Sequence, residues 1–230
     1  MPVKAQAYKQ ISTALELKNV KLVAVSKTKP VEDIFELYKL GHRDFGENYV
    51  QELAEKHLLL PHDIHWHFIG HLQSNKVKYI APFVHLVHGV DSFKLLVEIN
   101  KQGMKNHRVI ECLLQVHIAQ EETKFGLSEE ELDELVDDLQ KLNGTDQLHY
   151  VKITGLMGMA SFTEDENKIR GEFKYLAALF DKYSKVHTTN LELKNISMGM
   201  SSDYKIAMEE GSNMVRIGSL IFGEREQTAH

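Results

Sequence analysis

The sequence lacks several features that define common classes of protein. It has one cysteine, Cys112, among 230 residues, so no internal disulfide can form, which suits a reducing compartment. No apolar stretch is long enough to cross a membrane, and the first ten residues contain no apolar signal core. We therefore expect a soluble protein of the cytoplasm with no membrane partner.

Basic charge is also scarce. The formal net charge is −6 at pH 7, and no basic face stands out, which argues against a nucleic-acid partner. No repeat, low-complexity linker or break in composition divides the chain. Because 43% of the residues are hydrophobic, one sizeable core is possible, and we expect a single domain over residues 1–230.

The sequence instead contains eight apolar segments that alternate with helical patterns. The predicted strands lie at residues 20–26, 43–46, 64–69, 84–87, 109–118, 151–159, 195–200 and 214–218. A weakly amphipathic segment at residues 2–15 precedes them and is placed to cap the lower end of a barrel. Such alternation predicts a parallel α/β sheet, and eight units favour a closed (β/α)8 barrel over a doubly wound sheet.

Capping signals mark the starts of four of the predicted helices, and Asp91-Ser92 after the fourth predicted strand is one of them. Ser128 with Glu131, and Thr163 with Glu166, have the spacing of capping boxes. Ser202 follows the seventh predicted strand and is expected to begin a short helix.

Lys27 occupies the position where the first strand ends and the next helix is about to begin at Pro30. In α/β barrels this is the catalytic rim. A lysine there is either a solvated loop charge or an amine held for carbonyl chemistry. Position alone favours the solvated charge, because lysine side chains are mostly exposed.

The other predicted strand ends bring further polar side chains to the same rim. They include Asn48, Tyr49, His67, His88, His117, Ser201, Ser202, Arg216, Gly218 and Ser219. The loops after the seventh and eighth strands, with a short helix, form the recurrent phosphate site of this fold. The alternative is a plain helix cap and a tight turn.

A closed barrel places such a phosphate site next to Lys27, because the eighth strand pairs with the first. A lysine beside a phosphate pocket, with Arg216 on the adjoining strand, suggests pyridoxal 5′-phosphate (PLP). Lys27 would form a Schiff base, and Arg216 would face the pyridine nitrogen. The alternative for Arg216 is a salt bridge inside the end of the barrel.

Three histidines, His62, His65 and His67, resemble a metal cluster. A structural zinc site needs about four ligands, and the only cysteine lies on another strand. We therefore expect no metal site.

Several long motifs occur in one order along nearly the whole chain. They are LVAVSKTKP at 22–30, FGENYVQE at 45–52, WHFIGHLQSNK at 66–76, KFGL at 124–127, GLMGM at 155–159, SMGMSSD at 197–203 and VRIGSLIFG at 215–223. On these motifs the sequence resembles the pyridoxal phosphate homeostasis proteins, which are related in fold to the barrel domain of bacterial alanine racemase.

The resemblance implies that Lys27 carries PLP as a Schiff base, that Asn48 lies near the cofactor ring and that Arg216 faces the pyridine nitrogen. It further implies phosphate contacts from Ser201, Ser202, Gly218 and Ser219. It gives no chemical role to His67, Gln73 or Lys76, and Lys124 is expected to be a solvated loop residue.

The chemistry of the predicted site favours a carrier over an enzyme. Arginine is not a usable acid, so a ring nitrogen facing Arg216 stays a weak electron sink. Racemases of this fold take a second base, a tyrosine, from another domain, for which a chain ending at His230 has no room. Tyr49 is the only rim tyrosine that could replace it, and a packed or solvent-exposed side chain is the favoured alternative for Tyr49.

We therefore expect a monomeric PLP carrier or regulator that serves apo PLP-dependent enzymes, as the resemblance also implies. The alternative is a weak PLP-dependent amino-acid racemase.

Overall fold

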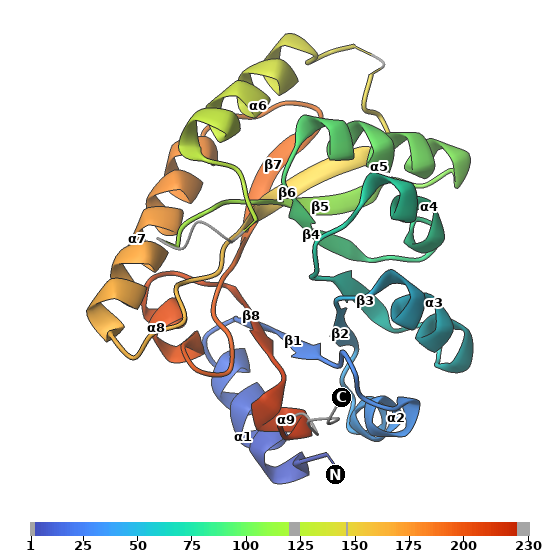
Figure 1. The fold of residues 1–230 in the computed structure, drawn as a ribbon, viewed down its shortest axis with the longest axis vertical. Helices are drawn as coiled ribbons and strands as arrows, with labels where there is room; N and C mark the ends of the chain where they lie inside the picture. The colour runs from blue at the N-terminus through green and yellow to red at the C-terminus, as the bar shows by residue number, and fades with distance from the viewer. Residues whose placement is uncertain (1–2, 120–124, 146, 225–230) are drawn as a thin grey trace, which may run out of the picture.

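The computed structural model describes residues 3–119, 125–145 and 147–224, and its central feature is a closed barrel of eight parallel strands (Figure 1). The strands are β1 Lys21–Val25, β2 Asp44–Glu47, β3 His65–Phe68, β4 Leu86–Val90, β5 Ile110–Gln115, β6 Val151–Met157, β7 Leu191–Ser197 and β8 Met214–Ile217. Each strand pairs with the next, and β8 pairs with β1. The predicted (β/α)8 barrel is confirmed.

Helices surround the barrel and connect its strands (Figure 1). They are α1 Ala5–Glu16, α2 Val31–Lys39, α3 Val50–Leu59, η1 Ser74–Lys76, α4 Val77–Ile80, α5 Phe93–Lys105, α6 Glu129–Lys141, α7 Glu166–Tyr183, α8 Tyr204–Glu209 and α9 Ser219–Phe222. None of the helices in the described ranges combines the length and the apolar character that a membrane span requires.

Two of the four predicted helix starts are wrong. The cap at Ser92 is confirmed, because its hydroxyl accepts from the Leu95 N–H at the start of α5. The capping box of Ser128 and Glu131 at α6 is confirmed. At α7 the cap is Asp165, whose carboxylate accepts hydrogen bonds from the next backbone N–H groups, because an aspartate competes well for the N-cap position. Ser202 lies in a turn, and α8 begins at Tyr204.

Strand β7 begins at Leu191, four residues before the predicted start at residue 195. The polar residues of its first half hid it from the apolar pattern. Glu192 faces outward and pairs with Lys152 of β6 at 2.7 Å. The two strands approach so closely that a Cβ on Gly155 would lie 1.9 Å from the carbonyl oxygen of Asn195, so only glycine fits there.

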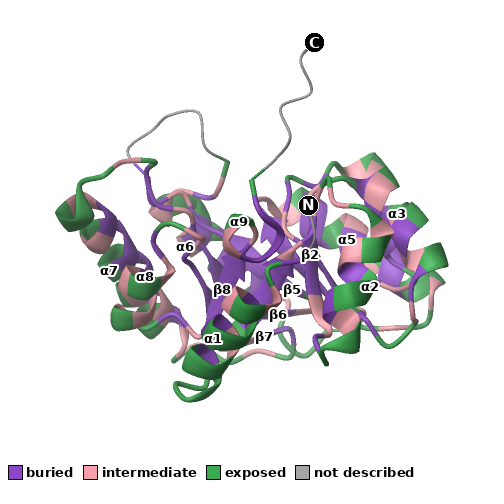
Figure 2. Ribbon diagram, turned by 90° about the horizontal axis from the view of Figure 1, so that it is seen from below, coloured by how far each residue is buried: buried purple, intermediate pink, exposed green. Residues whose placement is uncertain are grey.

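The strands of the barrel are mostly buried (Figure 2). Side chains fill its interior, so it is not a pore. Val23, Leu86, Leu113, Met157 and Met214 form a small apolar cluster inside it. A larger apolar core fills the layer between the strands and the surrounding helices, and the lone Cys112 is buried there, as expected.

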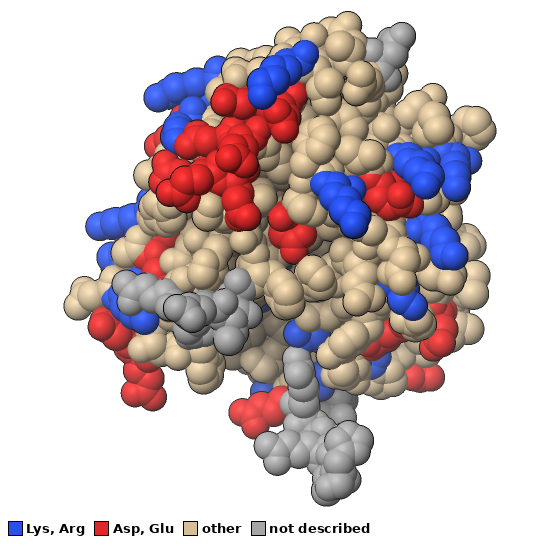
Figure 3. Space-filling model, turned by 45° about the horizontal axis from the view of Figure 1, so that its top comes forward, with Lys and Arg blue, Asp and Glu red and all other residues tan. Residues whose placement is uncertain are grey.

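Acidic side chains gather over α6, as Figure 3 shows. Glu129 and Asp133 on this helix receive Lys182 of α7 at 3.0 Å each. The apolar stripe of α6 is buried, so the acidic run is the solvated face of a capped helix.

Helix α1 lies along the side of the barrel, packed against α9 and β1. At the lower end its Tyr8 contacts the buried imidazole of His42, with 3.4 Å between the hydroxyl oxygen and Nδ1. His42 Nε2 lies 2.8 Å from the carbonyl oxygen of Asp44, which can only accept. The ring therefore carries its proton on Nε2, and burial lowers the pKa of His42 to about 4.

This lowered pKa predicts a loss of stability in mild acid. Below the ordinary histidine pKa of 6.5, His42 becomes protonated in the unfolded chain. In the folded protein it stays neutral until the pH reaches about 4. We expect His42 to contribute a loss on the order of 2–3 kcal/mol as the pH falls from 7 to 4.5. Urea unfolding at both pH values should show a smaller loss for His42→Gln than for the native chain. The exposed His149→Gln variant is the control, and equal losses in all three proteins would contradict the prediction.

Candidate functional site

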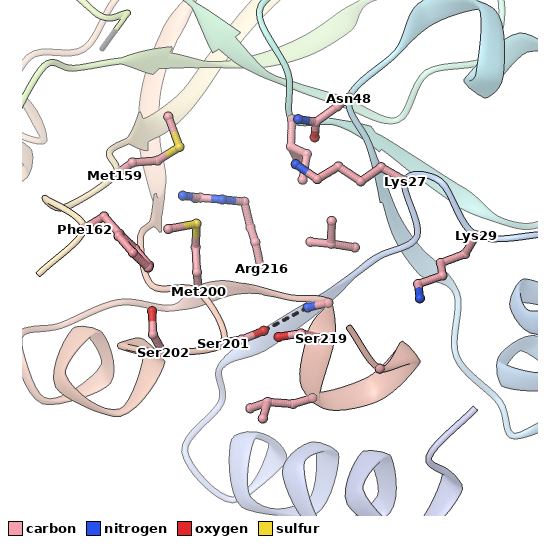
Figure 4. A pocket seen from close by; sticks show the side chains of 15 residues that line it. Lys27, Lys29, Asn48, Met159, Phe162, Met200, Ser201, Ser202, Arg216 and Ser219 are labelled. Carbon is pink, nitrogen blue, oxygen red and sulfur yellow. Dashed lines mark hydrogen bonds between the residues drawn. The ribbon is translucent and has the colours of Figure 1, made fainter. Parts of the chain in front are cut away.

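A cavity of about 580 Å³ opens where β1, β2 and β8 end (Figure 4). The structure brings every site residue predicted from the sequence to its wall: Lys27, Asn48, Ser201, Ser202, Arg216, Gly218 and Ser219. Met159, Phe162 and Met200 line the opposite side.

The backbone on both sides of Lys27 is fixed by carboxylates. The Ser26 hydroxyl donates to Glu47 Oε1 at 2.7 Å, and the Thr28 N–H donates to Glu52 Oε1 at 2.6 Å. Thr28 has a φ of 63°, a left-handed conformation that costs energy for a β-branched residue. These two anchors therefore set the direction in which Lys27 leaves the strand.

Lys56 holds the two carboxylates in place. Its buried ammonium group donates to Glu47 Oε1 at 2.8 Å, to Glu52 Oε1 at 2.6 Å and to the Ser26 carbonyl oxygen at 2.8 Å. The sequence analysis missed this network, although Glu52 and Lys56 have the i, i+4 spacing of a helical ion pair. We call Ser26, Thr28, Glu47, Glu52 and Lys56 the lysine support.

The loops after β7 and β8 meet on the other side of the cavity. The Gly218 N–H donates to the Ser201 hydroxyl at 3.2 Å (Figure 4). A Cβ on Gly218 would lie 3.2 Å from the Val25 carbonyl oxygen, so the backbone here closely approaches β1. Lys29 ties down the following turn, donating to the carbonyl oxygens of Phe222 at 3.0 Å and Glu224 at 3.2 Å.

Arg216 enters the cavity from β8 and is 4% exposed. One guanidinium nitrogen donates to the carbonyl oxygen of Ser197 at 2.9 Å and to its hydroxyl at 2.6 Å, and the other donates to the Gly158 carbonyl oxygen at 3.0 Å. These neutral acceptors replace the salt bridge that was the alternative. Burial lowers the pKa of Arg216 to about 10, which keeps the group charged at neutral pH.

The described contacts leave Arg216 with Nε–H and one Nη2–H for a ligand. Asn48 presents an acceptor that lacks a donor: its buried Oδ1 has no hydrogen-bond partner among the residues that the structure describes. A buried amide oxygen without a partner costs free energy, so a ligand that donates to it is favoured.

The charges at the cavity suit an anion. Its described lining includes Lys27, Lys29 and Arg216 and contains no carboxylate. With the orphaned oxygen of Asn48 and the Ser201–Gly218 turn, the residues present fit a phosphorylated carbonyl compound. The donors on one side and the lysine amine on the other match what PLP requires.

Several residues that the sequence placed at the rim lie elsewhere. His67 and His88 are fully buried in the barrel interior, because their strands continue beyond them. Tyr49 is 55% exposed and does not line the cavity. Lys124 lies outside the described residues.

The lower end of the barrel gathers a group that the sequence analysis did not find. Potential ligand atoms of Asp44, His67 and His85 lie within 4.8 Å of one another. Asp44 belongs to β2 and His85 directly precedes β4, and neither was among the three histidines considered in the sequence. Asp44 Oδ1 already receives His67 at 2.9 Å and Lys21 at 3.4 Å, so its charge is compensated without a metal ion. That the chain binds no metal stays a prediction.

The lysine support gives a direct test of how Lys27 is held. Lys56→Met leaves two carboxylates around an empty cation position and should destabilise the protein by about 3–5 kcal/mol. The exposed Lys18→Met variant is the matched control. Denaturant unfolding measures both changes, and equal free energies of unfolding would show that Lys56 holds nothing in place.

Comparisons with known proteins agree with this geometry. Residues 5–226 match the profile of the alanine racemase N-terminal domain. A pyridoxal phosphate homeostasis protein of Aquifex aeolicus is 42% identical over 207 residues, covering 90% of this chain and 87% of the relative. The human protein of the same name is 38% identical over 216 residues, covering 90% of this chain and 77% of the relative.

Solved structures of related fold support the same family assignment. The structure of PipY from Synechococcus elongatus with PLP bound is 32% identical, with a TM-score of 0.81, and the match covers 94% of this chain and 99% of that one. An alanine racemase from Bartonella henselae is 15% identical, with a TM-score of 0.67, over 95% of this chain and 59% of that one; it shows the fold alone. The chain belongs to the alanine racemase N-terminal domain family and, within it, to the pyridoxal phosphate homeostasis proteins.

Proposed function

We propose that this chain binds PLP in the cavity and holds it as a Schiff base on Lys27. The amine of Lys27 would condense with the PLP aldehyde and release one water. The observation that carries the proposal is the convergence of Lys27, Asn48 and Arg216 on one cavity beside the Ser201–Gly218 turn. The PLP bound to the related PipY supports it.

Each lining residue has a part in this proposal. PLP would supply an aldehyde and an aromatic ring able to stabilise carbanions. Asn48 Oδ1 would accept from the 3-hydroxyl of the ring, and Arg216 would donate to the pyridine nitrogen. The phosphate would accept from the hydroxyls of Ser201, Ser202 and Ser219 and from the backbone around Gly218.

We further propose that the chain serves PLP homeostasis and supply without strong catalytic activity. Arg216 stays protonated at neutral pH and so passes no proton to a ring nitrogen. Racemisation needs a base on each face of the substrate. The ionisable groups of the described lining are Lys27, Lys29 and Arg216, and Lys29 is held by two carbonyl oxygens. This lining supplies Lys27 as one base and no evident second.

The sequence-based expectations on setting stay predictions. They are a single PLP-binding domain over residues 1–230, a monomer, a cytoplasmic location and apo PLP-dependent enzymes as recipients of the cofactor.

Titration with PLP, followed by absorbance, tests the binding proposal. The native chain should develop a Schiff-base band, and Lys27→Ala should lose it and bind PLP at least about tenfold more weakly, or by more than about 1.4 kcal/mol. The exposed Lys9→Ala should behave as the native chain. A native protein that takes up no PLP would end the proposal.

The carrier and the racemase hypotheses predict different results when the loaded protein is given amino acids. The loaded protein is incubated with single enantiomers of alanine and serine and, separately, with an apo PLP-dependent enzyme. Activation of the apo-enzyme without racemisation is the expected result. Steady racemisation that Lys27→Ala abolishes would favour the weak racemase.

A further inference from the structure

A row of polar side chains crosses the interior of the barrel, from its lower end to the PLP cavity. Asp44 of β2, His67 of β3, His88 of β4, Ser197 of β7 and Arg216 of β8 belong to it, and we call these five residues the core polar network. Its three middle members are each 0% exposed. Every consecutive pair is in hydrogen-bond contact, although the residues come from five different strands.

The contacts form one unbroken series. His67 Nε2 lies 2.9 Å from Asp44 Oδ1, and His67 Nδ1 lies 3.0 Å from His88 Nε2. His88 Nδ1 lies 3.2 Å from the Ser197 hydroxyl, which in turn lies 2.6 Å from a guanidinium nitrogen of Arg216.

The protonation states set the direction of all four hydrogen bonds. Burial alone would raise the pKa of Asp44, but the hydrogen bond from His67 and the nearby positive charge of Lys21 hold it well below its usual value. Asp44 is therefore a carboxylate, which can only accept. Burial lowers the pKa values of His67 and His88, so both rings are neutral, with one donor and one acceptor each.

The donor and the acceptor of each hydrogen bond can be assigned in order, from Asp44 to Arg216. His67 Nε2–H must donate to Asp44, which leaves His67 Nδ1 to accept from His88 Nε2–H. His88 Nδ1 must then accept from the Ser197 hydroxyl, which accepts from Arg216, a group that can only donate. Every donor thus points from Arg216 toward Asp44, and every buried group in the series is satisfied.

We propose that His67, His88 and Ser197 are positioning residues that fix the guanidinium group of Arg216 and couple it to the Asp44 carboxylate at the opposite end of the barrel. The network occupies one guanidinium nitrogen, and the Gly158 carbonyl oxygen takes one N–H of the other. The Nε–H and the second Nη2–H are thereby directed at the ligand. Hydrogen bonds in a buried series polarise one another, so the charge of Asp44 strengthens the bonds above it. The effect on PLP rests on the proposed function, whereas the network itself does not.

The chain offers matched variants for the test. Ser197→Ala removes the hydroxyl next to Arg216. Ser212→Ala removes another buried hydroxyl, which donates to the backbone carbonyl oxygen of Met198 at 2.7 Å. This hydroxyl has no hydrogen bond to Arg216 among the described contacts. Asp44→Asn removes the distant charge, and Asp63→Asn removes another carboxylate of the lower end, which pairs with Arg43 at 2.8 Å.

For each variant, the affinity for PLP and the absorbance spectrum of bound PLP are measured. Ser197→Ala should weaken PLP binding about tenfold or more, because a hydrogen bond to a charged group is lost. Asp44→Asn, which does not line the cavity, should weaken binding about threefold or more and shift the absorbance band of bound PLP. Ser212→Ala and Asp63→Asn should leave both unchanged.

Nuclear magnetic resonance of the PLP-free protein tests the network separately. Histidine ring nitrogen signals, assigned with His67→Gln and His88→Gln, should show both rings protonated on Nε2. The Arg216 guanidinium signals should shift in Asp44→Asn and stay in place in Asp63→Asn.

Protonation of His67 or His88 on Nδ1 would overturn the inference. So would Arg216 signals that do not change in Asp44→Asn. So would PLP binding by Ser197→Ala and Asp44→Asn equal to that of their controls. A native protein that fails to bind PLP would instead refute the proposed function, and the resonance experiment would still decide on the network.

Discussion

The pairing of β8 with β1 closes the barrel, and the position of every cavity residue depends on it. Val23 lies opposite Arg216 in this pairing, and Ala24 lies opposite Ile217. The register brings the end of β1, with Lys27, beside the loop that begins at Gly218. Without closure these two segments, nearly two hundred residues apart in sequence, would have no reason to meet.

The closed sheet also has to bury charged groups, and it does so in two ways. At the end of β1 and β2, Lys56 is paired with two carboxylates and fixes the strand end that carries Lys27. Inside the barrel, Arg216 donates to neutral oxygen atoms and is linked to the Asp44 carboxylate through the core polar network. One arrangement fixes the strand end that carries Lys27. The other holds the guanidinium group of Arg216 and leaves its remaining N–H groups for the cavity.

The sequence predicted the order of the strands because apolar runs and helical spacing depend on local burial. It also predicted Lys27 and Arg216 at the cavity, because the barrel places strand ends at one rim. The start of β7 was missed since its polar residues face solvent. Ser202 was mistaken for the start of a helix that begins at Tyr204, with Asp203 at the N-cap position. The carboxylate of Asp203 accepts from the Met200 N–H and does not cap the helix, a choice that spacing alone does not predict.

The contacts that position the site were beyond the sequence for a different reason. The bonds of Lys56 to Ser26 and Glu47, and those that join His67 to His88, link different strands or a strand and a helix. Their partners become known only when the register of the barrel is known. The two buried histidines, His67 and His88, were placed at the rim, because polar side chains near strand ends usually lie there.

Borohydride reduction of the PLP-loaded protein, followed by peptide mapping, tests the central claim most directly. Reduction would fix a Schiff base as a stable amine that carries the cofactor on the lysine that bound it. The account predicts the label on the peptide that contains Lys27, and no such label at Lys29 or Lys56. A label on another lysine, or none at all, would contradict the assignment of this cavity as the PLP site.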